Sequence, residues 1–169
     1  MRRLLPLLLC VALVAGCAAK RLKRLEPDEH KHYMALKAYM EDGQREGFLK
    51  LKTRAERDEY LKKAGLWDRF YTLPPEVREQ IYGGEVQVGW TKDMVLMAWG
   101  KPVDSKKLAG RQAQRSFLYI YRFEQTQDGA LLVWEPGSKT QYKAAELWER
   151  HVFIDDDKVT KIDQKKGKW

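Results

Sequence analysis

Cys17 carries a nucleophilic thiol at a notable place, directly after a hydrophobic segment at the N-terminus. It is the residue of this chain best placed for covalent chemistry. Arg2 and Arg3 give this segment a positive start, and an almost uninterrupted apolar run follows over residues 4–16. A charged start, a short apolar run and small residues at its end are typical of a secretory signal. The run is shorter than the roughly 20 apolar residues that a membrane-spanning helix needs. The sequence therefore predicts an exported protein.

The order Ala15-Gly16-Cys17 resembles the lipobox of bacterial lipoproteins. In that family the cysteine thiol receives a diacylglycerol, the chain is cut before the cysteine, and the new amino terminus is acylated. The resemblance implies that residues 1–16 are a signal peptide and that Cys17 holds the mature chain on membrane lipid, because several acyl chains anchor firmly. An ordinary signal peptide with a chance cysteine is the alternative. Ala18 stands where an aspartate often marks inner-membrane retention, so the resemblance favours the outer membrane.

Composition limits the partners of the mature chain. Cys10 leaves with the signal, so stability must come from packing rather than from a disulfide. The formal net charge of +8 falls by two with the loss of Arg2 and Arg3. We expect a basic tether over residues 17–26, which either gains from an anionic lipid surface or only spaces the domain from it. Its basic residues are Lys20, Arg21, Lys23 and Arg24. An exported lipoprotein does not meet the genome, which excludes nucleic acid as the partner.

The remaining titratable residues nominate no catalytic or metal site. His30 and His32 alternate, which points them apart on a helix, and we expect both to be exposed to solvent. His151 falls in a predicted strand beside Arg150 and is expected to have a cross-strand structural role. The run 155–157 of three aspartates lacks the spacing of a calcium loop and predicts a turn. We therefore expect no cofactor and no enzyme activity; a cleft with converging titratable groups would revive the enzyme hypothesis.

The first half of the chain shows helical patterns. We expect a helix over residues 27–42, with Gly43 as its stop. A second helix is predicted after Thr53, which has capping-box spacing to Glu56. Pro74-Pro75 is predicted to open a third short helix, with Val77 and Ile81 on one side, and Gly83-Gly84 to end it.

The second half predicts a helix followed by β-structure. A short strand is expected at residues 86–88, and then a helix capped by Thr91 that ends before Gly100. Asp128-Gly129 is a hairpin signal, and Pro136-Gly137 ends the strand that follows it. Strands are expected at residues 117–123, 130–134, 147–154 and 159–162. The predicted fold class is α+β, with N-terminal helices followed by a helix and a three- to four-stranded antiparallel β-meander.

Large side chains near the predicted strand ends are candidates for a partner surface. Trp134, Trp148 and Arg150 lie in or beside strands, and aromatic and arginine side chains carry much of the binding energy at protein interfaces. Partial burial against a helix is the alternative for the two tryptophans.

A second resemblance covers roughly residues 85–163. The segment 88–95, followed by Gly100-Lys101-Pro102, resembles the SmpA/OmlA (BamE-like) outer-membrane lipoproteins. The strand Val152-Phe153-Ile154, the acidic turn and Lys158-Val159-Thr160 look like the final hairpin of that family, and Phe117-x-Tyr119 stands where it usually has Trp-x-Tyr. The matching motif residues are Gly89, Thr91, Val95, Gly100 and Pro102.

The resemblance implies a periplasm-facing, non-catalytic accessory of outer-membrane β-barrel assembly or of envelope integrity. The resemblance also implies protein partners and contact with anionic lipid. The helical region 27–84 and an extra strand before residue 147 depart from the family pattern, and residues 85–169 form the BamE-like domain. The alternative function is a binding module for another envelope protein or for cell-wall glycan.

A weaker resemblance joins the chain to the GWxTD domain, whose role is unknown. The resemblance is carried by residues 48–51, 56–57 and 66–67, followed by Gly89-Trp90 and by Gly100 and Pro102. Lys92 breaks the usual threonine-aspartate order of that domain.

Overall fold

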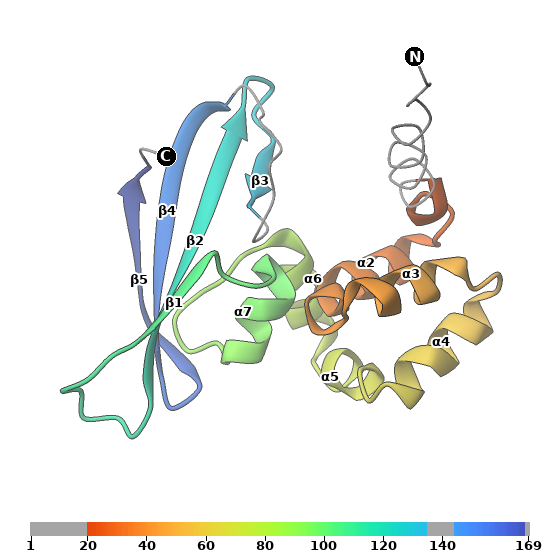
Figure 1. Ribbon diagram of the computed structural model, residues 1–169, viewed down its shortest axis with the longest axis horizontal. Coiled ribbons are helices and arrows are strands. Elements are labelled where there is room, and N and C mark those ends of the chain that lie inside the picture. Colours follow the sequence, from red (N-terminus) through yellow and green to blue (C-terminus); the bar gives the residue numbers. More distant parts are fainter. Residues whose placement is uncertain (1–19, 135–143, 168–169) are drawn as a thin grey trace, which may run out of the picture. The chain divides into compact units, whose positions relative to one another are not determined.

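The computed structural model describes residues 20–134 and 144–167 (Figure 1). Cys17, the predicted signal and Pro136-Gly137 lie outside these ranges. The chain divides into two compact units between Leu73 and Pro74. This division places the helix at residues 75–83 in the second unit, whereas the sequence grouped it with the helices before it.

The first unit is helical. Its elements are α2 (Pro27–Leu36), the 3-10 helix η1 (Lys37–Tyr39), α3 (Asp42–Lys50), α4 (Arg54–Lys63) and α5 (Trp67–Tyr71). Pro27 is the first residue of α2, as predicted. The Thr53 side chain accepts a hydrogen bond from the backbone N–H of Glu56, and the two residues form the predicted capping box at the start of α4. These local signals fix where the two helices begin.

The predicted helix over residues 27–42 is wrong beyond Leu36. A 3-10 turn follows, and Met40 then takes an extended conformation with φ −101° and ψ 140°. Met40 is 1% exposed, so its burial in the core accompanies the break. Glu41 then forms a capping box with Gln44 and starts α3, a helix that the sequence analysis missed. Gly43 is consequently a residue of α3 and not a helix stop.

Apolar side chains from four helices form the core of the first unit. The rings of Phe48 in α3 and Tyr33 in α2 stack with centroids 5.3 Å apart. Leu36, Phe48 and Leu61 are 0% exposed, and full burial of such side chains contributes roughly 1.5–3 kcal/mol each. Phe70 of α5 is also buried.

A buried ion pair also joins α2 to α4. The Arg57 guanidinium donates to both carboxylate oxygens of Glu29, at 2.7 and 3.0 Å. Glu29 is 0% exposed and also accepts from the backbone N–H of Glu26 at 3.0 Å, but Arg57 supplies the charge that balances this buried carboxylate.

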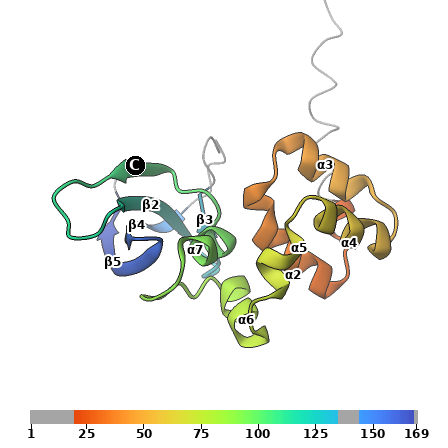
Figure 2. The ribbon, with the colours of Figure 1, turned by 90° about the horizontal axis from the view of Figure 1, so that it is seen from below.

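The second unit combines two helices with an antiparallel sheet, which gives the chain its α+β fold. Its elements are α6 (Pro75–Gly83), α7 (Lys92–Trp99), β1 (Asp104–Lys107), β2 (Ser116–Thr126), β3 (Leu131–Val133), β4 (Ala144–Asp155) and β5 (Lys158–Lys166). The sheet order is β1-β2-β4-β5, and β3 also pairs with β2 (Figures 1 and 2). The strand β1 pairs with residues 117–120 of β2 and β3 with residues 123–125.

The predicted strands at 117–123, 147–154 and 159–162 are confirmed and are longer than expected, while the strand at 130–134 is shortened to β3. The described sheet has five strands rather than three or four, because β1 was not predicted. All residues of β1 are exposed and polar, so it has no alternating apolar pattern. Residues 86–88 are not a strand: Val88 is 61% exposed, and the N–H of Trp90 donates to the carbonyl of Gln87 across a turn.

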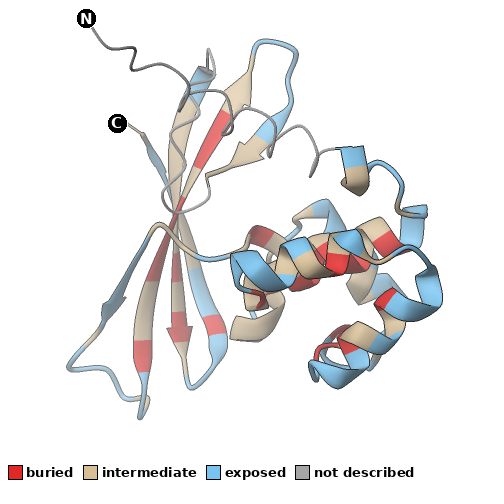
Figure 3. Cartoon of the chain, turned by 45° about the vertical axis from the view of Figure 1, so that its right-hand side comes forward, coloured by how far each residue is buried: buried red, intermediate tan, exposed pale blue. Residues whose placement is uncertain are grey.

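Helix α7 packs on one face of the sheet. The Trp99 ring lies edge-on to Tyr121 at 5.2 Å and to Phe123 at 5.0 Å. We call the face with Tyr121 and Phe123 the inner face, and the face with Ile120, Arg122 and Phe153 the outer face. Buried residues concentrate in β2 and β4 at the centre of the sheet (Figure 3).

Candidate functional site

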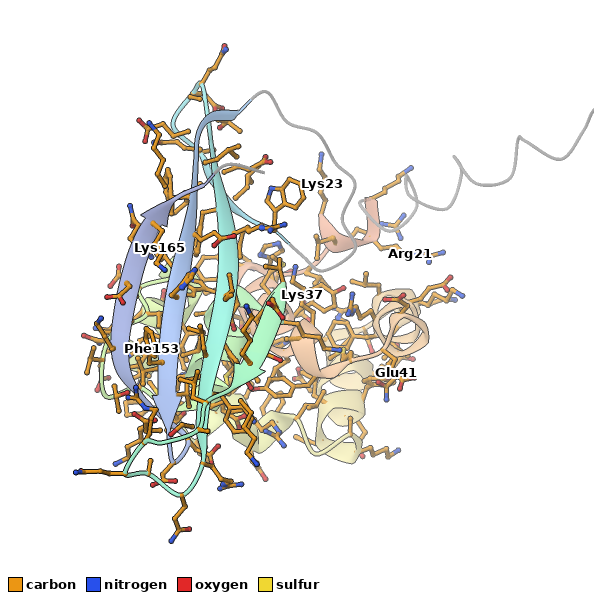
Figure 4. The ribbon with its side chains drawn as sticks, turned by 60° about the vertical axis from the view of Figure 1, so that its left-hand side comes forward. Arg21, Lys23, Lys37, Glu41, Phe153 and Lys165 are labelled. Atoms are coloured by element: carbon orange, nitrogen blue, oxygen red, sulfur yellow. The ribbon has the colours of Figure 1, made fainter. Side chains whose placement is uncertain are left out.

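The described chain begins inside the predicted basic tether. Lys20 to Leu22 form a helical turn, and the N–H of Arg24 donates to the carbonyl of Arg21. Lys23 and Arg24 are exposed, and Figure 4 labels Arg21 and Lys23 just after the undescribed segment. Within the described ranges, no helix has the length and apolar character to cross a membrane.

The motif residues Gly89 to Pro102 build the ends of α7. The Thr91 hydroxyl accepts a hydrogen bond from the N–H of Met94 at 3.3 Å, so Thr91 is the predicted N-cap. Val95 is 0% exposed and belongs to the core. Gly100 follows the helix with φ 76° and ψ −156°, and Pro102 prevents continuation. The positive φ was expected, but the ψ is extended rather than left-handed helical.

The start of this motif is tied to the β4–β5 hairpin. The N–H of Gly89 donates to the carbonyl of Val159, and the N–H of Val159 donates to the carbonyl of Trp90, both at 2.8 Å. The N–H of Lys92 donates to the carbonyl of Asp157 at 2.8 Å. These bonds fix α7 against the sheet, so the motif has a structural role in this fold.

Trp148 and Arg150 lie together on the inner face of β4. Their register partners on β2 are Phe123 and Tyr121. The Arg150 guanidinium lies 4.9 Å from the Phe123 ring centroid and 5.2 Å from that of Trp99. The Trp148 ring stacks on Phe123 with centroids 6.3 Å apart and an interplanar angle of 10°. The two predicted partner residues are therefore half-buried members of one aromatic–arginine cluster.

The Arg150 guanidinium of this cluster is half-buried on aromatic rings, which is an unusual environment for a charged group. Burial lowers the pKa of the Arg150 guanidinium from its ordinary value. Among the described residues its polar partner is Gln164, whose side-chain oxygen accepts from Nε at 3.4 Å, and no carboxylate contacts it. The Nε1–H of Trp148 is buried and also has no described acceptor. The half-exposed guanidinium can take an anionic group as its counter-ion, whereas the buried Nε1–H of Trp148 is closed to a ligand from outside.

Trp134 lies apart from the other two predicted partner residues. Its backbone N–H donates to the carbonyl of Arg122 at 2.9 Å and so continues the β2–β3 ladder. Because side chains alternate along a strand, a residue opposite Arg122 belongs to the outer face. The tertiary structure thus divides the predicted surface between two faces of the sheet.

The histidines occupy different environments. His30 is half-buried, whereas the expectation of exposure is wrong for His32, which is 0% exposed. The oxygen of Tyr71 lies 2.6 Å from Nδ1 of His32, and burial lowers the pKa of this imidazole. His151 lies on the outer face, where its Nε2 is 3.0 Å from a carboxylate oxygen of Glu149. This contact lies within β4, so it is not the cross-strand contact that was expected of His151.

The three aspartates form the predicted turn between β4 and β5. Asp156 and Asp157 have φ of 47° and 64°, the positive values of a two-residue hairpin turn that aspartate tolerates. Arg111 binds Asp155 through two hydrogen bonds, and Arg115 binds Asp157 at 2.8 Å. The hydrogen bonds from Arg111 hold the pKa of Asp155 well below its usual range. No local pattern indicates these arginines, because more than 40 residues separate the members of each pair.

The outer face carries paired charges around a half-buried aromatic ring. Glu149 accepts from Arg122 at 3.2 Å in addition to its contact with His151. Two cations lie near the Phe153 ring centroid, the Arg111 guanidinium at 5.7 Å and the Lys161 ammonium at 5.4 Å. Residues 20–134 and 144–167 contain no group of three or more acidic, histidine or cysteine side chains that could hold a metal ion.

Comparison with known proteins gave no match, whether to protein-family models, to curated proteins or to solved structures.

Proposed function

We propose that the chain is a lipid-anchored, non-catalytic envelope protein that faces the periplasm at the outer membrane. Its role would be that of an accessory in β-barrel assembly or envelope integrity. The hydrophobic N-terminal segment that ends at Cys17 carries this proposal, because its charge, length and small residues agree with a lipoprotein signal. The helix-then-meander order of the second unit supports the BamE-like part of the proposal.

The Trp148–Arg150 cluster supports a binding role. A half-buried arginine on an aromatic surface is a frequent anchor at protein interfaces, and its donors lack a described anionic partner. We propose that an envelope protein makes this contact.

The helical first unit favours a second candidate function. Its own core and the buried pair Glu29–Arg57 make it a folded unit larger than the short helical part of BamE-like proteins. A separate binding module, for a different envelope protein or for cell-wall glycan, is therefore the alternative proposal.

Crosslinking in native membranes tests the two proposals. The wild-type chain should crosslink to components of the barrel-assembly machinery, and capture of sacculus fragments instead would favour the alternative. Arg150→Met keeps most of the packing over Trp99 but removes the charge, so it should weaken crosslinking by at least tenfold. A matched control is His30→Gln with His151→Gln, which should leave crosslinking unchanged. Loss of function in the histidine control alone would contradict the non-catalytic proposal.

The anchor is tested separately by Cys17→Ser, because a hydroxyl does not replace the thiol as the acceptor. Cells fed a fatty-acid analogue should label the wild-type chain and not this variant. Equal labelling of both would contradict the lipoprotein proposal.

A further inference from the structure

The strand β5 forms one edge of the sheet, and only part of that edge is covered. At its beginning, the backbone of Val159 pairs with Gly89 and Trp90 through two hydrogen bonds of 2.8 Å. The pairing of β4 and β5 then shifts between Phe153 and Ile154, which leaves Thr160 as an extra residue in a bulge. Beyond this bulge, residues 161–166 continue as a strand with β4 on one side.

The register shows which backbone groups of this segment point outward. The N–H of Gly167 donates to the carbonyl of Leu147 at 2.8 Å, so Gly167 faces β4. Because inward and outward groups alternate in an antiparallel pair, Lys165 faces β4 as well. The N–H and C=O groups of Ile162, Gln164 and Lys166 therefore point away from the sheet, with no partner among the described residues.

Three of the six residues over 161–166 are lysines, against one aspartate, so this edge carries a net positive charge. Lys161 binds Asp163 at 2.7 Å, whereas Lys165 and Lys166 are exposed and contact no carboxylate in the described chain. Figure 4 shows Lys165 on β5, beside the strand that carries Phe153. Lysines on an edge disfavour pairing with a second copy of the same strand through charge repulsion. The same charges favour an acidic strand, so they select among partners rather than simply block the edge.

We propose that the outer edge of β5 over residues 161–166 binds an extended, acidic polypeptide segment as an additional strand. The outward backbone groups supply the hydrogen bonds of strand addition, and the lysines supply the preference for carboxylates. The pairing of Val159 with Gly89 and Trp90 closes the rest of the edge, which limits the added strand to the segment beyond the bulge. This inference does not depend on lipid anchoring or on a role in barrel assembly.

The first test uses a fluorescent ten-residue peptide of alternating glutamate and valine, titrated into the purified full-length chain. Gln164→Pro removes one outward N–H, and proline is tolerated on a strand edge where that N–H faces solvent. This variant should weaken binding at least tenfold while the circular dichroism spectrum stays native. Gln164→Thr keeps the N–H and is the matched control, with affinity within twofold of wild type. Hydrogen exchange should also slow at Ile162, Gln164 and Lys166 when the peptide is added.

Charge reversal gives a second readout that does not require a proline in the strand. The double variant Lys165→Glu and Lys166→Glu should lose affinity for the glutamate peptide at least tenfold and gain affinity for the matching lysine–valine peptide. Binding to the wild type should weaken as salt concentration rises. The proposal is overturned if the glutamate peptide does not bind at millimolar concentration, if the wild type binds the lysine peptide equally well, or if a folded Gln164→Pro variant binds normally. Dimerisation of the chain through this edge would also overturn it.

Discussion

Replacement of Gly100 by alanine should destabilise the second unit through backbone geometry alone. Gly100 ends α7 with φ 76° and ψ −156°, a combination that is essentially restricted to glycine. A Cβ built at Gly100 meets no atom within 4 Å, so steric crowding by neighbours contributes nothing. The Tyr121 hydroxyl donates to the Gly100 carbonyl at 3.1 Å, which holds the peptide in place and opposes relaxation to ordinary dihedrals.

The magnitude follows from two opposing contributions. Holding a residue with a side chain in such a region costs about 1–3 kcal/mol. Alanine also lowers the entropy of the unfolded chain, which stabilises the folded state by about 0.4–1 kcal/mol. The net loss should therefore be about 1–2 kcal/mol. For a unit of fewer than 100 residues this corresponds to a fall in Tm of roughly 5–15 °C.

Calorimetry of the full-length chain measures this effect, with Gly47→Ala as the control. Gly47 lies inside α3 without a positive φ, and a Cβ there also meets nothing within 4 Å. Alanine is the better helix former by about 1 kcal/mol, so the control should be neutral or stabilising. A Tm for Gly100→Ala within 2 °C of wild type would refute the reasoning, because it would mean that the turn uses ordinary dihedrals in solution.

Three further predictions concern the first unit and the aromatic–arginine cluster. Burial lowers the pKa of His32 below its ordinary 6.5, so the unfolded chain binds a proton more readily than the folded chain does. The free energy of unfolding, measured in urea, should therefore fall as the pH drops through about 6.5. His32→Gln should flatten this dependence between pH 7 and 5, and an unchanged profile would contradict the burial of a neutral His32. Arg57→Met leaves the Glu29 carboxylate buried without its partner and should cost about 3–5 kcal/mol in urea unfolding, while Arg54→Met at the exposed pair with Asp28 should cost under about 1 kcal/mol. Trp148→Ala removes a ring stacked on Phe123, so it should lower both the Tm and the near-UV circular dichroism signal of the cluster. If the Tm and this signal both stay at their wild-type values, the stack is absent in solution.

The helix ends show how far local sequence can determine structure. Three predicted helix ends are confirmed: the capping box of Thr53 and Glu56, the N-cap Thr91 of α7, and the stop of α6 at Gly83-Gly84. Such ends are predictable because a cap is satisfied by residues within one turn of the chain. Asp156 and Asp157 likewise adopt the predicted turn from their own tolerance of positive φ. The lipoprotein signal predicted at Cys17 likewise rests on adjacent residues alone, and it stays a prediction.

The missed elements depend on contacts that are distant in sequence. The break after Leu36 accompanies the burial of Met40, and α3 belongs to the core through Phe48, which stacks on Tyr33 of another helix. The strand β1 is polar and exposed along its length, and only its backbone pairing with β2 makes it a strand. Neither property is present in the local pattern of residues.

The candidate surface shows the same division. Sequence singled out Trp134, Trp148 and Arg150 because of their residue types, and that choice required no structure. Tertiary structure alone decided that Trp148 and Arg150 lie on the inner face, against which Trp99 of α7 packs, and that the ladder position of Trp134 belongs to the outer face. Strand register sets which side of a sheet a residue occupies. It also decided that His32 is buried, since exposure depends on which helices pack around a side chain and not on the residue itself.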